Sequence, residues 1–163
     1  MNLRSLHRPL AACLLGMSVC AGAAAAPEYT TIVMEKTVDR PADVVWKKIG
    51  GYCDIATWLK VTCVLTSGTG DVGTMRRLND KTDEVMVAKT QHSYTYTQPT
   101  TTILYHGTLA VQADGPRHSK IVYTLFYDMS PLATPEARTA DREQRTTRFS
   151  AALDVMKQLA EAK

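Results

Sequence analysis

Two segments in the second half of the chain alternate apolar and polar residues with a period of two. In residues 120–129 the apolar positions are Ile121, Tyr123, Leu125 and Tyr127. Residues 103–113 repeat the pattern with Ile103, Tyr105, Gly107, Leu109 and Val111. A period of two places one set of side chains on one face of a strand, and a polar opposite face is typical of antiparallel sheets. These segments therefore predict antiparallel strands with one buried side.

Shorter segments of strand character precede them. Turn residues separate strands that we predict at residues 61–66, 74–78, 84–90 and 94–97. The Thr-, Ile- and Val-rich run at 29–38 predicts a further strand near the start of the chain. Pro41 then suits the first position of a helix, which Gly50 and Gly51 close. A second short helical piece is expected at 53–58.

The C-terminal segment changes to a helical period. Thr134 is a suitable N-cap and Pro135 a suitable first helical residue. Beyond them the residues that recur at helical spacing are Phe149, Ala152, Leu153, Met156, Leu159 and Ala160. The predicted order is one strand, two short helices, six strands and one long helix, which makes a single α+β domain.

The first 25 residues have the features of a secretory signal peptide. Arg4 and Arg8 provide a basic start, residues 10–26 carry no charge, and the run ends in alanines. The apolar run is too short for a comfortable membrane span of about 20 residues. We therefore expect cleavage near Ala24 or Ala25, a mature domain of residues 26–163, and a periplasmic or secreted location. A retained N-terminal anchor is the alternative.

The charge of the chain does not indicate a nucleic-acid partner. The formal net charge is +3, and it falls to +1 once Arg4 and Arg8 are removed with the signal peptide. Nucleic-acid binding depends on a concentrated positive field, which this balance does not supply.

Two cysteines, Cys53 and Cys63, remain after the expected cleavage. In an exported protein such a pair predicts a disulfide rather than a redox or metal site, with two free buried thiols as the alternative. Two cysteines cannot complete a zinc site, and no histidine lies at ligand spacing from either of them. We expect no metal.

The sequence also lacks the common catalytic motifs. It contains no Gly-x-Ser-x-Gly elbow, no His-Glu-x-x-His motif and no glycine-rich phosphate loop. His92, His106 and His118 lie beside turns or on the polar face of a strand, so we expect them at the surface. We therefore predict no catalytic residue and no cofactor.

Three runs carry a resemblance to a known family. Arg40-Pro41-Ala42-Asp43-Val44-Val45-Trp46 opens the first predicted helix, and Tyr52-Cys53-Asp54-Ile55-Ala56-Thr57-Trp58 follows it. Ser93-Tyr94-Thr95-Tyr96 and the final amphipathic helix complete the set. Together they resemble the START-like superfamily (SRPBCC), in its polyketide cyclase/dehydrase and lipid transport branch, over nearly all of the expected mature chain.

This resemblance implies a helix-grip fold, in which a curved antiparallel sheet of about seven strands wraps around the long C-terminal helix and encloses a cavity. Exported relatives often follow the tryptophan with His-Pro, whereas Leu59-Lys60 follow Trp58 here. Any chemistry that depends on that histidine is therefore not expected in this protein.

Tyrosines on the predicted concave face are candidates for the cavity wall. Tyr96, Tyr105, Tyr123 and Tyr127 would line an apolar pocket with a few hydroxyl groups, or would simply fill the core. The other apolar residues expected to line the cavity are Trp58, Leu109, Phe149 and Met156.

Arginines extend the apolar stripe of the final helix toward its start, at Arg145, Arg142 and Arg138. With Arg76 from the third strand, they would lie at the cavity mouth and bind an anionic group such as a carboxylate. Alternatively, this half of the helix faces solvent and Asp141 pairs with Arg138 and Arg145 at helical spacing.

These features favour an exported protein that binds a hydrophobic or amphipathic small molecule, such as a lipid, a polyketide-like or an aromatic compound. One alternative is a cyclase/dehydratase-type enzyme acting on a polyketide-like substrate. Another is a non-catalytic envelope or stress interaction protein with a filled cavity.

Overall fold

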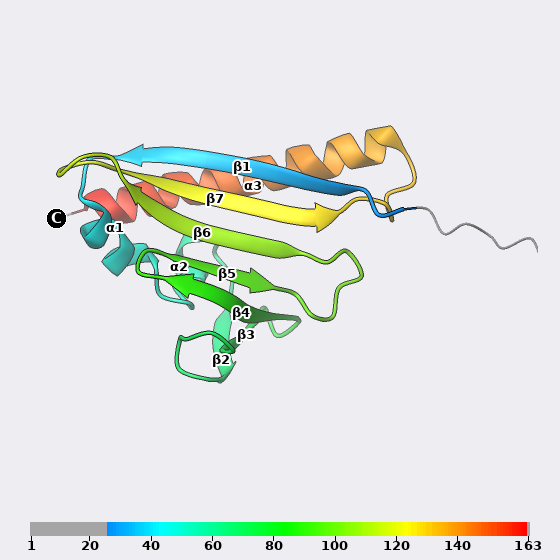
Figure 1. Cartoon of the computed structure of the whole chain (residues 1–163), viewed down its shortest axis with the longest axis horizontal. Helices are drawn as coiled ribbons and strands as arrows, with labels where there is room; N and C mark the ends of the chain where they lie inside the picture. The colour runs from blue at the N-terminus through cyan, green and yellow to red at the C-terminus, as the bar shows by residue number, and fades with distance from the viewer. Residues whose placement is uncertain (1–25, 163) are drawn as a thin grey trace, which may run out of the picture.

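The computed structural model describes residues 26–162 and shows a seven-stranded sheet with a long helix against one face (Figure 1). The elements are β1 (Tyr29–Val38), α1 (Ala42–Ile49), α2 (Ile55–Trp58), β2 (Cys63–Ser67), β3 (Met75–Leu78), β4 (Thr82–Thr90), β5 (Ser93–Thr97), β6 (His106–Ala113), β7 (Ser119–Asp128) and α3 (Pro135–Glu161). This is the predicted order of elements. The predicted signal peptide, residues 1–25, lies outside the described residues.

The sheet order is β1-β7-β6-β5-β4-β3-β2, and every neighbouring pair is antiparallel. Consecutive strands from β2 to β7 pair with one another, and β1 forms the far edge beside β7. Register shifts between Leu65 and Ser67 in β2, and between Met86 and Ala88 in β4, mark irregularities that bend a strand and increase its twist. The predicted curved antiparallel sheet is confirmed.

Side-chain alternation gives the sheet a buried concave face and an outer face. Leu125 and Tyr127 of β7 are buried, whereas Phe126 between them is 37 % exposed and stacks on Tyr29 of β1; Ile121 and Tyr123 are buried on the same face as Leu125. Each large side chain buried on the concave face contributes about 1.5–3 kcal/mol. A slip of one residue would move these side chains to solvent, so the alternation also fixes the register.

The helix α3 runs along the β1 and β7 side of the sheet (Figure 1). Thr134 caps it by accepting a hydrogen bond from the Ala137 N–H at 3.1 Å, and Pro135 is its first residue, as predicted. The buried residues of α3 all lie in its second half: Phe149, Ala152, Leu153, Met156 and Ala160. The first half of α3 therefore contributes no buried residue to the core. Within residues 26–162, no helix is both long enough and apolar enough to cross a membrane.

Most of the predicted starts of helices and strands shift by one to three residues, and two of these corrections concern a proline and a left-handed residue. Pro41 is the N-cap of α1 rather than its first helical residue. Strand β6 begins at His106 rather than at residue 103, because Leu104 has a φ of 49°, which interrupts the extended backbone. Tyr105 still points inward and is only 3 % exposed.

The predicted disulfide is confirmed between Cys53 and Cys63, whose Cα atoms are 5.6 Å apart. It closes a loop that contains α2 and joins this loop to the start of β2. A cross-link over such a short loop stabilises the fold by about 3 kcal/mol, mainly by restricting the unfolded chain.

Candidate ligand cleft

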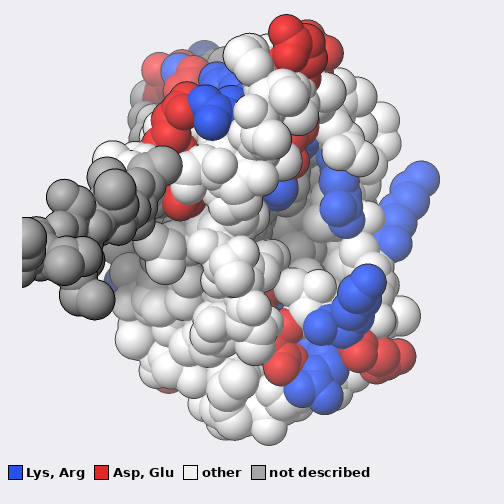
Figure 2. Space-filling view, turned by 90° about the vertical axis from the view of Figure 1, so that its right-hand side faces the viewer, with Lys and Arg blue, Asp and Glu red and all other residues white. Residues whose placement is uncertain are grey.

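A cleft of about 310 Å³ opens between the first half of α3 and strands β3 to β5. The α2 segment borders it on one side and the β5–β6 loop on another. Figure 2 faces this open end of the molecule and shows a hollow with Lys and Arg side chains along one side. The hollow remains because this half of α3 carries polar residues and does not pack into the core.

The floor of the cleft is formed by the lining residues that are buried. These are Ile55, Leu78, Glu84, Tyr96, Tyr105 and Phe149. All are apolar or aromatic except Glu84, a carboxylate that is 2 % exposed. Apolar and aromatic side chains in a concave floor can hold the apolar part of a small molecule.

The rim of the cleft is formed by the lining residues that remain partly or fully exposed. These are Leu59, Val61, Asn79, Thr82, Gln98, Asp141, Gln144, Arg145 and Arg148. Most are polar, so a bound molecule would meet hydrogen-bonding groups at the mouth and an aromatic surface below.

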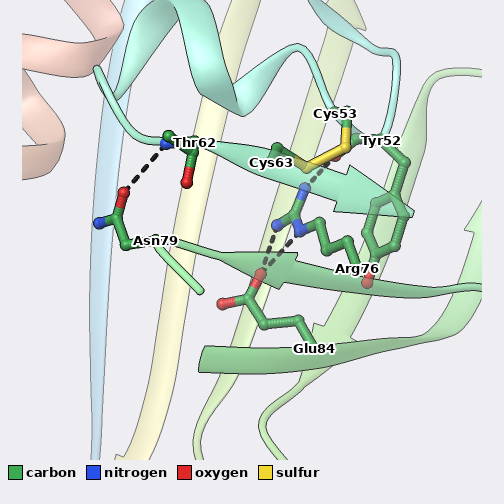
Figure 3. Close-up of a disulfide and its surroundings, with 7 residues drawn as sticks. All are labelled: Tyr52, Cys53, Thr62, Cys63, Arg76, Asn79 and Glu84. Atoms are coloured by element: carbon green, nitrogen blue, oxygen red, sulfur yellow. Dashed lines mark hydrogen bonds and ion pairs between the residues drawn. A yellow bond between two sulfur atoms is a disulfide. The ribbon is translucent and has the colours of Figure 1, made fainter. Parts of the chain in front are cut away.

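Glu84 in the floor is held by Arg76 (Figure 3). Nε and Nη2 of Arg76 lie 2.8 and 2.6 Å from Oε2 of Glu84, and Nη1 donates to the Tyr52 carbonyl oxygen. The two residues are directly opposite on β3 and β4. Because Arg76 is fully buried and paired, its expected position at the cavity mouth is corrected: it lies behind the floor.

Three tyrosine rings surround this guanidinium. Cζ of Arg76 lies 4.1, 4.8 and 5.7 Å from the ring centroids of Tyr52, Tyr96 and Tyr94, within the range of cation–π attraction. Burial by itself lowers the pKa of Arg76, but Tyr94, Glu84 and Tyr96 more than offset this effect and raise it. The guanidinium therefore stays charged in the interior.

Tyr96 contributes both a ring and a hydroxyl to the floor. Its hydroxyl lies 2.9 Å from that of Tyr123. Burial raises the pKa of both groups well above the usual value, so both stay protonated and one donates to the other. Tyr123 also packs on Phe149 and Trp58, at centroid distances of 4.6 and 5.9 Å.

A second cluster lies at the rim. The Tyr127 hydroxyl and Nε of Arg145 both donate to Oδ2 of Asp141, at 2.6 and 2.8 Å. Cζ of Arg145 lies 4.4 Å from the Tyr127 ring centroid and 5.3 Å from that of Tyr105. Although burial opposes ionisation, the two hydrogen bonds hold the pKa of Asp141 below its usual range. Burial raises the pKa of Tyr105 to about 12.

The structure brings four of the predicted lining residues to the cleft, namely Tyr96, Tyr105, Arg145 and Phe149. Trp58, Leu109, Tyr123 and Met156 are each at most 2 % exposed and lie outside its lining. Tyr127 is also buried and reaches the rim through Asp141. This corrects the expected position of these five residues on the cavity surface, since they pack in the core that supports the floor.

Two of the predicted arginines on α3 face away from the cleft. Arg138 pairs with Glu28 just before β1, and Nη1 of Arg142 donates to the Thr30 hydroxyl on β1. The expected position of Arg142 at the cavity mouth is therefore corrected. The stripe that continues from Phe149 to the helix start therefore borders the cleft at Arg145, while Arg142 and Arg138 lie over β1 and the residues before it.

Arg148 borders the cleft, although the sequence analysis did not select it. It is exposed and forms none of the ion pairs found within residues 26–162. Arg148 lies three residues after Arg145, so the two side chains share one side of α3. They form a basic edge to the rim.

The three histidines within residues 26–162, His92, His106 and His118, lie outside the cleft lining. Nε2 of His92 is 2.6 Å from Oδ1 of Asp43, and Nδ1 of His106 is 2.7 Å from the Leu104 carbonyl oxygen. The His118 side chain is 52 % exposed. No imidazole among them reaches the floor for acid–base chemistry.

Sequence reasoning missed most of the polar lining. A signal for Glu84 was present, because Arg76 and Glu84 lie at equal distances from the centre of the Asn79–Lys81 turn and both occupy inward positions. The other missed residues come from α2 and the residues after it, from the β3–β4 hairpin, from the β5–β6 loop and from the first half of α3. They are Ile55, Leu59, Val61, Leu78, Asn79, Thr82, Gln98, Asp141, Gln144 and Arg148.

A curved antiparallel sheet that wraps one long helix, and leaves a cleft beside it, defines a helix-grip domain. The family model for polyketide cyclase/dehydrase and lipid transport matches residues 29–161, and the chain belongs to this family. The resemblance seen in the sequence is thereby confirmed. No curated protein matches the sequence.

Solved structures share this fold. A protein from Nitrosospira multiformis is 20 % identical, with a TM-score of 0.65 over 79 % of this chain and 94 % of its own. The di-domain ARO/CYC protein of the BE-7585A biosynthetic pathway is 20 % identical, with a TM-score of 0.64 over 83 % and 51 %. Norcoclaurine synthase from Thalictrum flavum, in complex with dopamine and hydroxybenzaldehyde, is 18 % identical, with a TM-score of 0.61 over 84 % and 91 %. Likeness at this level of identity shows the fold.

Proposed function

We propose that this protein binds a small amphipathic molecule, with one or two rings, in the cleft. The observation that carries this proposal is a buried aromatic floor beneath a polar rim. A volume of about 310 Å³ is at the lower end of the range for small-molecule sites, about 300–1,000 Å³. A ring compound fits such a volume better than a lipid with two acyl chains.

The basic edge of the rim favours a ligand with an anionic group. Asp141 and Glu84 each already accept hydrogen bonds from an arginine, Arg145 and Arg76 respectively. Among the charged lining residues that the structure describes, Arg148 is therefore the one that is not paired with an opposite charge. Its planar guanidinium suits a carboxylate, which would place the acid at the mouth and the ring on the floor.

The comparisons support an aromatic ligand. The family is described by polyketide cyclisation and lipid transport, and norcoclaurine synthase shares the fold and holds two aromatic compounds. Catalysis is the second candidate function, because the Tyr105 hydroxyl could polarise a carbonyl group in the floor, with Glu84 as the proton acceptor. Binding is favoured over catalysis since Arg76 and Gln98 already engage both oxygens of Glu84.

Export is part of the proposal. Residues 1–25 have signal-peptide features, and a disulfide is typical of proteins in oxidising compartments. N-terminal sequencing of protein recovered from the periplasm is expected to begin at Ala25 or Ala26. Recovery of the uncleaved chain in the cytoplasm would contradict export.

Cinnamate, a one-ring carboxylate, is a suitable probe for the cleft. We expect saturable NMR shift changes in floor and rim residues on titration into the wild-type protein. Arg148→Gln should weaken binding by about fivefold, the upper range for an exposed ion pair. Arg142→Gln is the matched control, because Arg142 lies on the same helix but contacts Thr30. Absence of saturable shifts, or equal weakening by both variants, would overturn the proposal.

A further inference from the structure

Within the described part of the chain, the floor of the cleft contains a single charged group. Glu84 is 2 % exposed, and the other floor residues are aliphatic or aromatic. A buried carboxylate costs several kcal/mol unless it is paired. Its presence in an otherwise apolar surface therefore calls for an explanation beyond packing.

Arg76 fixes this carboxylate in place. The guanidinium of Arg76 lies behind the floor, anchored by the Tyr52 carbonyl oxygen and by the Tyr52 ring (Figure 3). Arg76 itself is absent from the cleft lining, whereas Glu84 is part of it. The arrangement presents a carboxylate to the ligand and keeps the cation out of reach.

Glu84 retains capacity for one more hydrogen bond. An ionised carboxylate has about four acceptor positions. Nε and Nη2 of Arg76 contact Oε2, and Nε2 of Gln98 donates to Oε1 at 2.9 Å. Oε1 therefore accepts one hydrogen bond from the described residues and can accept a second from a ligand on the floor.

We propose that the cleft selects aromatic acids that carry a hydrogen-bond donor, such as a phenolic hydroxyl, at the end remote from the acid. This inference rests on the proposed binding function. The acid lies at Arg148, the ring lies on Phe149 and the tyrosines, and the donor reaches Oε1 of Glu84. Arg76 is a positioning residue, because it acts on the ligand only through Glu84.

The alternative groups at this end of a ligand fit poorly. A ligand that carries only hydrogen at this position would leave the free acceptor position of Glu84 desolvated and unpaired. A ligand with an ether oxygen there would place one acceptor against another. A hydrogen bond to a charged group contributes more free energy than one between neutral groups. A buried acceptor that is left without a hydrogen-bond donor is costly. The floor therefore discriminates by hydrogen bonding rather than by shape alone.

The test compares three ligands by isothermal titration calorimetry on the wild-type protein. para-Hydroxycinnamate should bind about tenfold more tightly than cinnamate, as expected for one hydrogen bond to a charged acceptor. para-Methoxycinnamate should bind no better than cinnamate. Equal affinities for the hydroxy and plain acids would overturn this inference but leave the proposed function intact. Failure of all three acids to bind would overturn the proposed function itself.

Protein variants identify the acceptor. In Glu84→Gln the preference for the hydroxyl should fall to about twofold, because the charged acceptor is lost. Asp83→Asn is the matched control, since this neighbouring carboxylate pairs with Arg77 outside the cleft lining and its loss should keep the preference. The ratio of two affinities does not depend on overall stability, so it distinguishes recognition from folding. A full preference that persists in Glu84→Gln would show that the hydroxyl meets another group and would overturn the inference.

Discussion

Two clusters in this molecule use the same chemistry at different depths. In each, an arginine pairs with a carboxylate and lies over tyrosine rings. Arg76 and Glu84 have side chains that are 0 and 2 % exposed, with a closest contact of 2.6 Å. Arg145 and Asp141 have side chains that are 27 and 19 % exposed, with a closest contact of 2.8 Å. The two clusters are alike in their residue types, contact distances and ring contacts, but they differ in burial.

The difference shows how one interaction can serve two purposes. Water screens the rim pair, so it contributes little to stability but remains able to rearrange around a ligand. The interior pair is almost fully buried, so either partner left alone would be an uncompensated buried charge. The interior cluster therefore fixes a carboxylate in the floor, and the rim cluster leaves polar groups accessible at the mouth.

Arg76→Met should have the largest effect, because it leaves Glu84 buried without its cation. We expect a loss of about 3–5 kcal/mol in the free energy of unfolding, measured by urea denaturation. The double variant Arg76→Met/Glu84→Met removes both charges and should recover most of this loss. If the single variant were as stable as the wild type, the two clusters would not differ in the way described.

Removal of the disulfide should have the next largest effect. Cys53→Ser/Cys63→Ser is expected to lower the free energy of unfolding by about 3 kcal/mol. The closed loop also contributes Ile55, Leu59 and Val61 to the cleft, and Tyr52 beside Cys53 anchors Arg76. Cinnamate should therefore bind more weakly to the double variant than to the wild type in calorimetry without urea. The control is a reductant, which should weaken binding to the wild type and leave the variant unchanged.

Arg145→Met should have the smallest effect on folding. The pair is partly exposed, so we expect a loss of no more than about 1 kcal/mol in the free energy of unfolding. The pKa of Asp141 should rise toward its usual value, because one of the two hydrogen bonds that lower it is removed. Carboxyl carbon NMR during an acid titration would measure this change. A stability loss as large as that of Arg76→Met would show that the rim pair is not screened.

Much of the fold could be predicted from the sequence. Strand β1 has the predicted bounds, because its run of β-branched residues ends just before Asp39-Arg40-Pro41, which is unfavourable for a strand. The order of elements and the Cys53–Cys63 pairing are also confirmed, since periodicity, capping residues and cysteine count are local properties. The start of β6 was wrong because the left-handed conformation of Leu104 gives no signal in its residue type.

The candidate cleft could be predicted only in part. The alternation in β5 to β7 identified the inward tyrosines, and helical spacing identified Phe149 as inward. Neither pattern says how far α3 lies from each strand. That distance decides that Tyr105 borders the cleft while Tyr123 does not, and that Arg148 reaches its rim while Arg142 contacts Thr30.

The sequence by itself therefore determined the elements, their order, the buried face of each strand and the disulfide, because these depend on residues close together in the chain. Only the tertiary structure decided which charged side chains are buried and which remain accessible to solvent. Arg76 and Arg145 have the same side chain, and their roles follow from the elements that pack over them. Burial is a property of the whole arrangement, since it depends on segments far apart in sequence that exclude water together.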